Sequence, residues 1–145
     1  FLHIYKVNVV GPFQMVKACR QYLTQSPNPC VVNVSSIAGI KGTGSSIAYA
    51  SSKGALNTMT KSMARNLGPI RVNAVCPGFI QGEWLRKGLG SETYDRALTN
   101  IENTTPLGLA VTAGQVAECI YNLMALSTVV TGETILLDGG YHLTV

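Results

Sequence analysis

The fold of this chain is set by the stretch Cys30-Val31-Val32-Asn33-Val34-Ser35, a short and nearly continuous apolar run. The turn-forming residues 26–29, Ser-Pro-Asn-Pro, stand immediately before it. Apolar runs of this length between turn signals indicate strands, and strands without polar alternation are typical of parallel sheets that are covered on both faces. We therefore predict that residues 30–35 form a buried parallel strand.

Segments of helical and strand character alternate outward from this run. Helices show apolar residues at steps of three and four, and strands are short apolar runs that end at turn residues. The predicted elements, in chain order, are a helix from Gly11-Pro12 to about residue 25, the strand 30–35, a helix over about 49–67, a strand over 70–76, a helix that begins near Thr112 and a strand over 134–137. Pro12 is expected in the first turn of its helix, where the missing N–H has no partner to lose.

This alternation predicts an α/β domain with a parallel sheet. Residues 83–104 interrupt it, because they are mostly polar and have only weak helical character. We interpret them as a surface excursion from a single domain.

Composition and charge narrow the class of protein. The chain has 145 residues, of which 46% are hydrophobic and only 12% charged, and this suits one compact domain or a large piece of one. Residues 1–82 contain eight Lys or Arg and no Asp or Glu. A basic half is compatible with a phosphate-bearing cofactor or nucleic acid, and equally with acidic partners elsewhere in the fold. Because no Lys and Arg cluster is interleaved with aromatic residues, we expect no nucleic-acid partner.

The sequence predicts neither a metal centre nor a membrane span. Its four cysteines stand singly among apolar residues, which indicates buried free thiols in a reducing compartment such as the cytoplasm. His3 and His142 lie near opposite ends of the chain, without metal-ligand spacing. No apolar run approaches the roughly 18 residues of a membrane helix. Residues 1–10 lack the charged region and cleavage site of a signal peptide.

The residues best placed for chemistry are Tyr49 and Lys53, at the start of the helix over 49–67. Residues four apart share one helix face, so the phenol and the ammonium are expected to be neighbours. A free phenol has a pKa of about 10, and a nearby cation lowers that pKa toward the range of a useful acid or base. Taken alone, this spacing is also that of an ordinary solvated helix face.

Ser36 is the third candidate, because it follows the strand 30–35 directly. Ligands of open parallel sheets bind beyond the carboxyl ends of the strands, and Ser36 stands at that end. A hydroxyl there can hydrogen-bond a substrate oxygen on which charge develops. The alternative is a plain strand-end turn residue, a description that fits Ser35 better.

Five segments of the chain together resemble the short-chain dehydrogenase/reductase family. They are Val7-Asn8-Val9-Val10-Gly11, Val32-Asn33-Val34-Ser35-Ser36, Tyr49-Ala50-Ser51-Ser52-Lys53, residues 71–78 with their final Pro-Gly, and residues 131–140 with Thr-Gly-Glu and Leu-Asp-Gly-Gly. They occur in the family's order and with compatible spacing, and the match covers essentially the whole chain apart from residues 83–104. The resemblance implies a doubly wound parallel sheet of the Rossmann type, of which residues 1–145 are the C-terminal, catalytic half of the domain.

The same resemblance implies a role for each candidate residue. Tyr49 is expected to be the acid/base, and Lys53 to tune it and bind the nicotinamide ribose. Ser36 is expected to polarise the substrate carbonyl. Asn8 is expected to hold a water that links Lys53 to solvent as a proton relay.

Two further sets of residues follow from the resemblance. Pro77, Gly78 and the backbone near Ile80 are expected to line the nicotinamide site beside Tyr49 and Lys53. Residues 83–104 are expected to be the substrate-binding excursion, with apolar lining from Trp84, Leu85 and Tyr94, although a solvated loop-helix is the simpler alternative. Such a lining favours a medium-sized hydrophobic ketone or a 3-oxoacyl group as the small-molecule carbonyl or alcohol substrate.

The expected assembly is a homodimer or homotetramer. Helices similar to that over 49–67 pack against their symmetry mates in the family, and Leu56, Met59 and Met63 offer an apolar face. Burial against a missing part of the fold would explain the low charge content equally well.

The sequence departs from the family by an absence. It contains no TGxxxGxG loop and no Asn-Asn-Ala-Gly segment, which belong to the first half of the family's domain. The pyrophosphate loop and the residue that separates NAD from NADP are therefore missing, so the cofactor is expected to be NAD or NADP. We expect the chain to be part of a longer protein, and residues 1–145 alone to bind cofactor weakly and to be inactive.

The predicted function is hydride transfer between a nicotinamide cofactor and a ketone or secondary alcohol. One alternative is a non-catalytic family member that acts as a regulatory or structural subunit. Another is a related nicotinamide enzyme, such as a dehydratase or epimerase, that reuses Tyr49 and Lys53. The presence of Ser36, Tyr49, Lys53 and Asn8 together favours the reductase or dehydrogenase over a scaffold, which needs none of them. Substrate, stereochemistry and preferred direction stay open.

Overall fold

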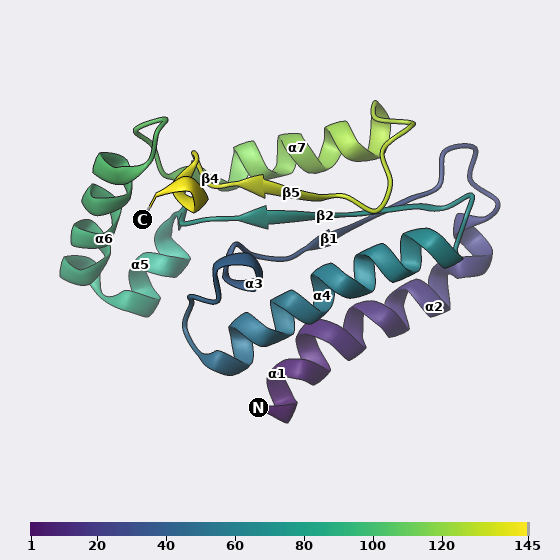
Figure 1. Ribbon diagram of the computed structural model, residues 1–145, viewed down its shortest axis with the longest axis horizontal. Helices are drawn as coiled ribbons and strands as arrows, with labels where there is room; N and C mark the ends of the chain where they lie inside the picture. The colour runs from purple at the N-terminus through teal and green to yellow at the C-terminus, as the bar shows by residue number, and fades with distance from the viewer. Residues whose placement is uncertain (145) are drawn as a thin grey trace.

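The computed structural model describes residues 1–144 and consists of a parallel sheet between two layers of helices (Figure 1). The elements in chain order are α1 (Leu2–Tyr5), the π-helix η1 (Lys6–Val10), α2 (Gly11–Leu23), β1 (Cys30–Val34), α3 (Ala38–Lys41), α4 (Ile47–Asn66), β2 (Arg71–Pro77), β3 (Ile80–Gln81), α5 (Glu83–Leu89), α6 (Ser91–Thr104), β4 (Val111–Thr112), α7 (Ala113–Ala125), β5 (Thr134–Leu137) and the 3-10 helix η2 (Tyr141–Leu143).

The main sheet has three parallel strands in the order β1-β2-β5. Val32 of β1 stands opposite Asn73 of β2, and Val75 of β2 opposite Ile135 of β5. Every residue of β2 is buried, because this strand has a neighbour on each side and helices on both faces. The predicted α/β fold with a parallel sheet is confirmed.

Helices cover the two faces of the sheet separately, as in a doubly wound fold. Figure 1 shows α2 and α4 on one face and α7 on the other. The first layer packs through a core of Val16, Met63, Ile70 and Val72. The second packs through Val75, Val111, Val116 and Leu123. Since connections on both faces return the chain to parallel strands, all the strand ends meet at one edge of the sheet.

The first helix differs from its predicted start at Gly11. Tyr5, Lys6, Val10 and Gly11 all have right-handed helical backbone angles, so α1, η1 and α2 form one continuous helix from Leu2 to Leu23. The N–H of Gly11 bonds to the carbonyl of Lys6, five residues back. Pro12 is therefore inside a helix, where it is accommodated because the wider π turn already interrupts the ladder of four-residue bonds that a proline cannot complete.

The segment 83–104 is more regular than its sequence predicts. It forms the two helices α5 and α6, which lie beyond the carboxyl end of the sheet (Figure 1). A second, two-stranded parallel sheet joins β3 to β4 at its base, with Ile80 opposite Val111. Two-residue strands of this kind carry too little pattern to be recognised in a sequence. Within residues 1–144, no helix combines the length and the apolar character that crossing a membrane requires.

α3 and α4 approach each other at a pair of glycines. A Cβ atom on Gly39 would lie 2.6 Å from the backbone nitrogen of Gly54 and 2.6 Å from the carbonyl carbon of Lys53. A Cβ atom on Gly54 would meet only the carbonyl oxygen of Gly39, at 3.5 Å. Only Gly39 is therefore required by space, and it sets how closely α3 sits on the turn of α4 that carries Lys53.

Gly39→Ala should destabilise the intact protein by roughly 1–3 kcal/mol, because the added methyl group would displace backbone rather than a flexible side chain. Gly54→Ala is the matched control on the other helix, and it should be neutral or raise stability by up to about 1 kcal/mol through helix propensity. Denaturant unfolding of the two variants gives both values. Equal stability changes for the two variants would contradict the contact described here.

Candidate active site

Ser36 lies just past the carboxyl end of β1, at the edge of the sheet where the strands end. The N–H of Ser35 bonds to the carbonyl of Val75 at 2.8 Å, and that of Ile37 to the carbonyl of Pro77 at 3.0 Å, so the backbone on both sides of Ser36 is fixed to β2. The Oγ of Ser36 accepts a bond of 3.1 Å from the N–H of Ala38. This contact does not use the hydroxyl proton, so a half-buried Ser36 can still donate to a substrate oxygen.

Tyr49 lies in the first turn of α4, which begins two residues earlier than predicted. Ser46 has extended backbone and caps the helix, and its Oγ accepts a bond of 3.1 Å from the N–H of Tyr49. The ring of Tyr49 passes Gly44, where a Cβ atom would lie 3.2 Å from the ring carbon Cδ1. The cap and the glycine together fix the position of the half-buried phenol.

Lys53 lies one helical turn after Tyr49, as their spacing predicts. Its Nζ is 5.7 Å from the centre of the Tyr49 ring. The same ammonium donates a bond of 2.9 Å to the carbonyl of Val34, two residues before Ser36. Burial lowers the pKa of Lys53, and the nearby Cys76 opposes that shift in part. The ammonium thus connects the helix of Tyr49 to the strand that leads to Ser36.

Asn8 is attached to this turn of α4 through Ser52. Its Nδ2 donates a bond of 3.0 Å to the Oγ of Ser52, and that hydroxyl donates one of 2.7 Å to the carbonyl of Tyr49. Ser52 is fully buried, so the pair forms an internal polar link between η1 and α4. Because Pro12 has no N–H, the backbone carbonyl of Asn8 lacks its usual α-helical donor.

Pro77 and Gly78 form the turn between β2 and β3, beside Ser36. The N–H of Gly78 bonds to the carbonyl of Leu137 at 2.9 Å. A Cβ atom on Gly78 would lie 2.8 Å from the Cβ of Asp138, so the turn passes too close to the end of β5 for a side chain. Ile80 follows in β3 and is half-buried. The three residues predicted to line a nicotinamide site therefore share one rigid segment at the edge of the sheet.

Cys76 lies directly beneath this edge and is completely buried. Its thiol donates to the Oδ1 of Asn57 at 3.5 Å, and burial raises the pKa of the thiol, which keeps it neutral. All four cysteines are free, as their isolated positions predict, but of the four only Cys76 is buried, because the others lie at the margins of the packed layers and are half-buried. No group of three His, Cys, Asp or Glu residues within residues 1–144 is arranged to hold a metal ion.

The residues predicted to line the substrate site do not share one environment. The side chain of Trp84 is 85% exposed at the start of α5, whereas Tyr94 of α6 is only 3% exposed. The hydroxyl of Tyr94 accepts a bond of 3.0 Å from the N–H of Gly82, and its ring packs against Phe79 at 5.5 Å between ring centres. Tyr94 therefore holds the base of α6 to the sheet. Leu85 is half-buried between these extremes.

Arg86 completes this packing and was not singled out from the sequence. Its guanidinium lies 4.3 Å from the centre of the Tyr94 ring and 2.9 Å from the carboxylate of Asp95. The structure thus shows α5 and α6 as one unit built around Tyr94. Sequence reasoning also missed Ser52, although its position three residues after Tyr49 places it on the same side of α4.

Comparison with known proteins agrees with this arrangement. Residues 1–142 match a protein-family profile described as enoyl-(acyl carrier protein) reductase. A protein of Streptomyces violaceoruber named as ketoacyl reductase 2 of the granaticin polyketide synthase is 41% identical over 138 residues, which cover 94% of this chain and 54% of that protein. The 3-oxoacyl-[acyl-carrier-protein] reductase FabG of Thermotoga maritima is 38% identical over 140 residues, with 94% and 55% covered.

Solved structures show the same fold. A short-chain dehydrogenase/reductase from Burkholderia xenovorans superposes with a TM-score of 0.83 at 40% identity, over 96% of this chain and 53% of that one. 4-Hydroxyisoleucine dehydrogenase complexed with NADH superposes with a TM-score of 0.84 at 28% identity, over 97% and 58%. A small-chain dehydrogenase in complex with NADPH gives a TM-score of 0.84 at 26% identity, over 94% and 60%.

The chain belongs to the short-chain dehydrogenase/reductase family, whose members use NAD or NADP. It spans about half the length of the curated relatives that it matches. The predicted family and the Rossmann-like fold are both confirmed.

Ser52→Ala should lower the free energy of unfolding of the intact protein by about 1–3 kcal/mol, because it leaves the amide of Asn8 without its buried partner. Ser51→Ala is the matched control, since the hydroxyl of Ser51 bonds only to the carbonyls of Ile47 and Ala48 within α4. It should change stability by less than about 0.5 kcal/mol. Thermal unfolding monitored by circular dichroism compares the two variants. An unchanged stability in Ser52→Ala would show that the hydrogen bond between Asn8 and Ser52 does not stabilise the fold.

Proposed function

We propose that the protein containing this chain is an NAD(P)-dependent oxidoreductase that transfers hydride between the nicotinamide and a ketone or secondary alcohol. The observation that carries the proposal is the Lys53 ammonium, which lies beside the Tyr49 ring and is bonded to the carbonyl of Val34, at the end of the strand that leads to Ser36. Membership of the short-chain dehydrogenase/reductase family supports it.

In this proposal Tyr49 is the acid/base. During reduction its hydroxyl gives a proton to the carbonyl oxygen, and during oxidation the phenolate takes the proton from the alcohol. Lys53 places a positive charge beside this phenol, with its Nζ 5.7 Å from the centre of the Tyr49 ring. Ser36 donates a hydrogen bond to the same oxygen, and this bond strengthens as negative charge develops there.

The residues present fit a nicotinamide nucleoside. The Lys53 ammonium has three N–H donors and uses one on Val34, so two remain for the hydroxyl groups of a ribose. Pro77, Gly78 and Ile80 offer a rigid segment against which a flat ring can lie beside Tyr49. When bound, the cofactor supplies or accepts the hydride. Whether it is NAD or NADP depends on the residue that faces the ribose 2′ position.

Asn8 is proposed to support the proton path. The carbonyl of Asn8 lacks an α-helical donor because residue 12 is proline, and it can therefore bind a water. That water would connect the Lys53 ammonium to solvent and return the proton that Tyr49 gives up. The bond from Asn8 to Ser52 keeps η1 in register with the turn that carries Tyr49.

The proposed substrate is a medium-sized hydrophobic ketone or 3-oxoacyl group, bound under α5 and α6. Two of the relatives above are named as reductases of ketoacyl groups, which agrees with this class. Leu85 and Trp84, with Leu89, are apolar residues of α5 that remain accessible for such a substrate. The buried ring of Tyr94 contributes by holding this unit in place. We further propose a cytoplasmic location, since four free thiols suit a reducing compartment.

Tyr49→Phe in the intact protein should reduce turnover by about 10²–10⁴-fold and leave the fold unchanged, because it removes only the transferable proton. Tyr22→Phe, at an exposed tyrosine of α2, is the control and should keep full turnover. NAD(P)H oxidation with a panel of ketones measures the rates, and circular dichroism checks the fold. No turnover in either the wild type or the Tyr49→Phe variant would favour a non-catalytic subunit, and equal measurable rates would overturn the acid/base role of Tyr49. Product analysis would reveal a dehydratase or epimerase.

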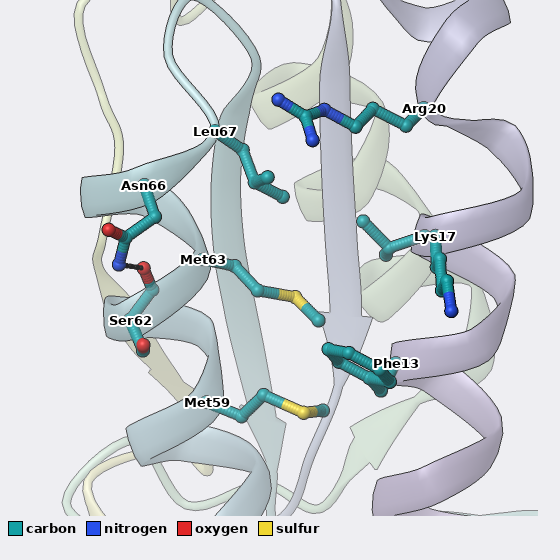
Figure 2. Close-up of a pocket in the computed structure, with 9 residues that line it drawn as sticks. Phe13, Lys17, Arg20, Met59, Ser62, Met63, Asn66 and Leu67 are labelled. Carbon is teal, nitrogen blue, oxygen red and sulfur yellow. Dashed lines mark hydrogen bonds between the residues drawn. The ribbon is translucent and has the colours of Figure 1, made fainter.

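We also propose that the protein is a homodimer or homotetramer that associates through α2 and α4. Leu56 of α4 is already buried within the chain, so it cannot form part of the interface suggested by the spacing of Leu56, Met59 and Met63. Figure 2 shows instead a groove between the two helices, into which Phe13 of α2 and Met59 of α4 point. Its volume is about 380 Å³, and a second copy related by a two-fold axis would bring two such faces together.

Phe13→Asp should weaken this association by about tenfold or more, because it places a charge among apolar residues of the interface. Met15→Asp, on the same helix but outside the groove, is the control and should associate as the wild type does. Size-exclusion chromatography with light scattering over a range of concentrations measures the change. A wild type that is monomeric at all concentrations would rule out the assembly.

A further inference from the structure

The C-terminal segment of the described chain lies at the same edge of the sheet as Ser36. β5 ends at Leu137, the turn 138–140 follows, and η2 then places residues 141–143 beyond the strand ends (Figure 1). Both glycines of the turn have positive φ angles, a backbone conformation that glycine adopts readily. The segment 138–144, here called the C-terminal segment, is therefore adjacent to the proposed active site.

The base of the C-terminal segment is held by Asp138. Its carboxylate accepts bonds from the N–H of Gly140 at 3.0 Å and from the N–H of His142 at 2.8 Å. The Nδ1 of His142 lies 2.9 Å from the same carboxylate. Asp138 also packs against Gly78, where any side chain would collide with it. The base of the segment is thus fixed to the turn that the nicotinamide is proposed to contact.

The far end of the C-terminal segment is held by Lys41. The Nζ of Lys41 donates to the carbonyl of Tyr141 at 3.2 Å and to the carbonyl of Thr144 at 3.0 Å. It also lies 4.6 Å from the centre of the Tyr141 ring, on its face. A single ammonium therefore binds two backbone carbonyls and an aromatic ring of a segment about 100 residues further along the chain.

Lys41 is directly connected to the proposed catalytic residues. It is the last residue of α3, which begins two residues after Ser36 and packs through Gly39 on the backbone of Lys53. Gly42 ends the helix in the left-handed conformation, with φ of 72°. Lys41 therefore connects the C-terminal segment to the short helix that follows Ser36.

We propose that Lys41 is a positioning residue that fixes the C-terminal segment as a wall of the substrate site beside Ser36. The proposal rests on the proposed function, because it concerns how that same site holds its carbonyl substrate. A wall that moves freely costs binding free energy for the substrate without altering the proton transfer by Tyr49. Loss of Lys41 should therefore raise KM while kcat changes little.

Lys41→Met in the intact protein tests this, because methionine keeps an unbranched apolar stem and removes all three donors. KM for the best ketone of the panel should rise roughly five- to tenfold, with kcat within about twofold of the wild type. Lys41→Arg, which keeps the charge and the donors, should recover at least half of the loss in kcat/KM. Lys61→Met, at an exposed lysine of α4, is the control and should leave both constants unchanged.

Hydrogen exchange measured by mass spectrometry gives a readout that does not depend on turnover. In Lys41→Met the amides of residues 139–144 should exchange faster, while peptides from β2 keep the wild-type rate. Faster exchange with an unchanged KM would overturn the positioning role, as would unchanged exchange. A wild type without turnover on any ketone would overturn the proposed function, and the positioning role with it. If the wild type is active but Lys41→Met leaves KM unchanged, only the positioning role of Lys41 is overturned.

Discussion

The bond between the Lys53 ammonium and the Val34 carbonyl is the contact on which the candidate site depends. It joins α4, which carries the phenol of the proposed chemistry, to the end of β1, and Ser36 with its hydroxyl follows two residues later. Partial burial makes the charge of Lys53 less favourable than in water, as the lowered pKa of Lys53 shows. The carbonyl, and the ring of Tyr49 nearby, offset part of that cost. The Lys53 ammonium, fixed by these two contacts, therefore sets the position of α4 relative to the end of β1.

Close backbone approaches surround this contact and make it rigid. Gly39 lets α3 sit directly on the backbone of Lys53, and Gly78 lets the turn after β2 pass against Asp138. A buried chain of polar groups from Asn8 through Ser52 to the carbonyl of Tyr49 adds a third connection. Several independent contacts therefore converge on one turn of α4, which suits a group that must transfer a proton at a defined position.

Much of the fold could be predicted from the sequence, and the failures have physical reasons. Strong local patterns gave the helix of Tyr49 and the three strands of the main sheet correctly. The predicted burial of the strand over 30–35 was wrong: β1 lies at the edge of the sheet, is mostly half-buried, and leaves Val34 49% exposed. The continuous helix through Pro12 was missed because a π turn has no signature in residue pattern, and a proline normally marks a helix start. The helical content of residues 83–104 was underestimated because these two helices are stabilised by contacts of Tyr94 with Phe79 and Arg86. These residues are separated in the sequence and meet only in the folded chain.

The sequence by itself determined the family, the alternation of helices and strands, and the pairing of Tyr49 with Lys53, because these depend on local spacing and on motifs in a fixed order. Only the tertiary structure decided which polar groups meet: Lys53 with Val34, Asn8 with Ser52, and Lys41 with the C-terminal segment. It also decided that Trp84 is exposed and Tyr94 buried, although both are aromatic residues of one segment. Burial and long-range hydrogen bonds depend on how separate elements pack, and no local pattern specifies that.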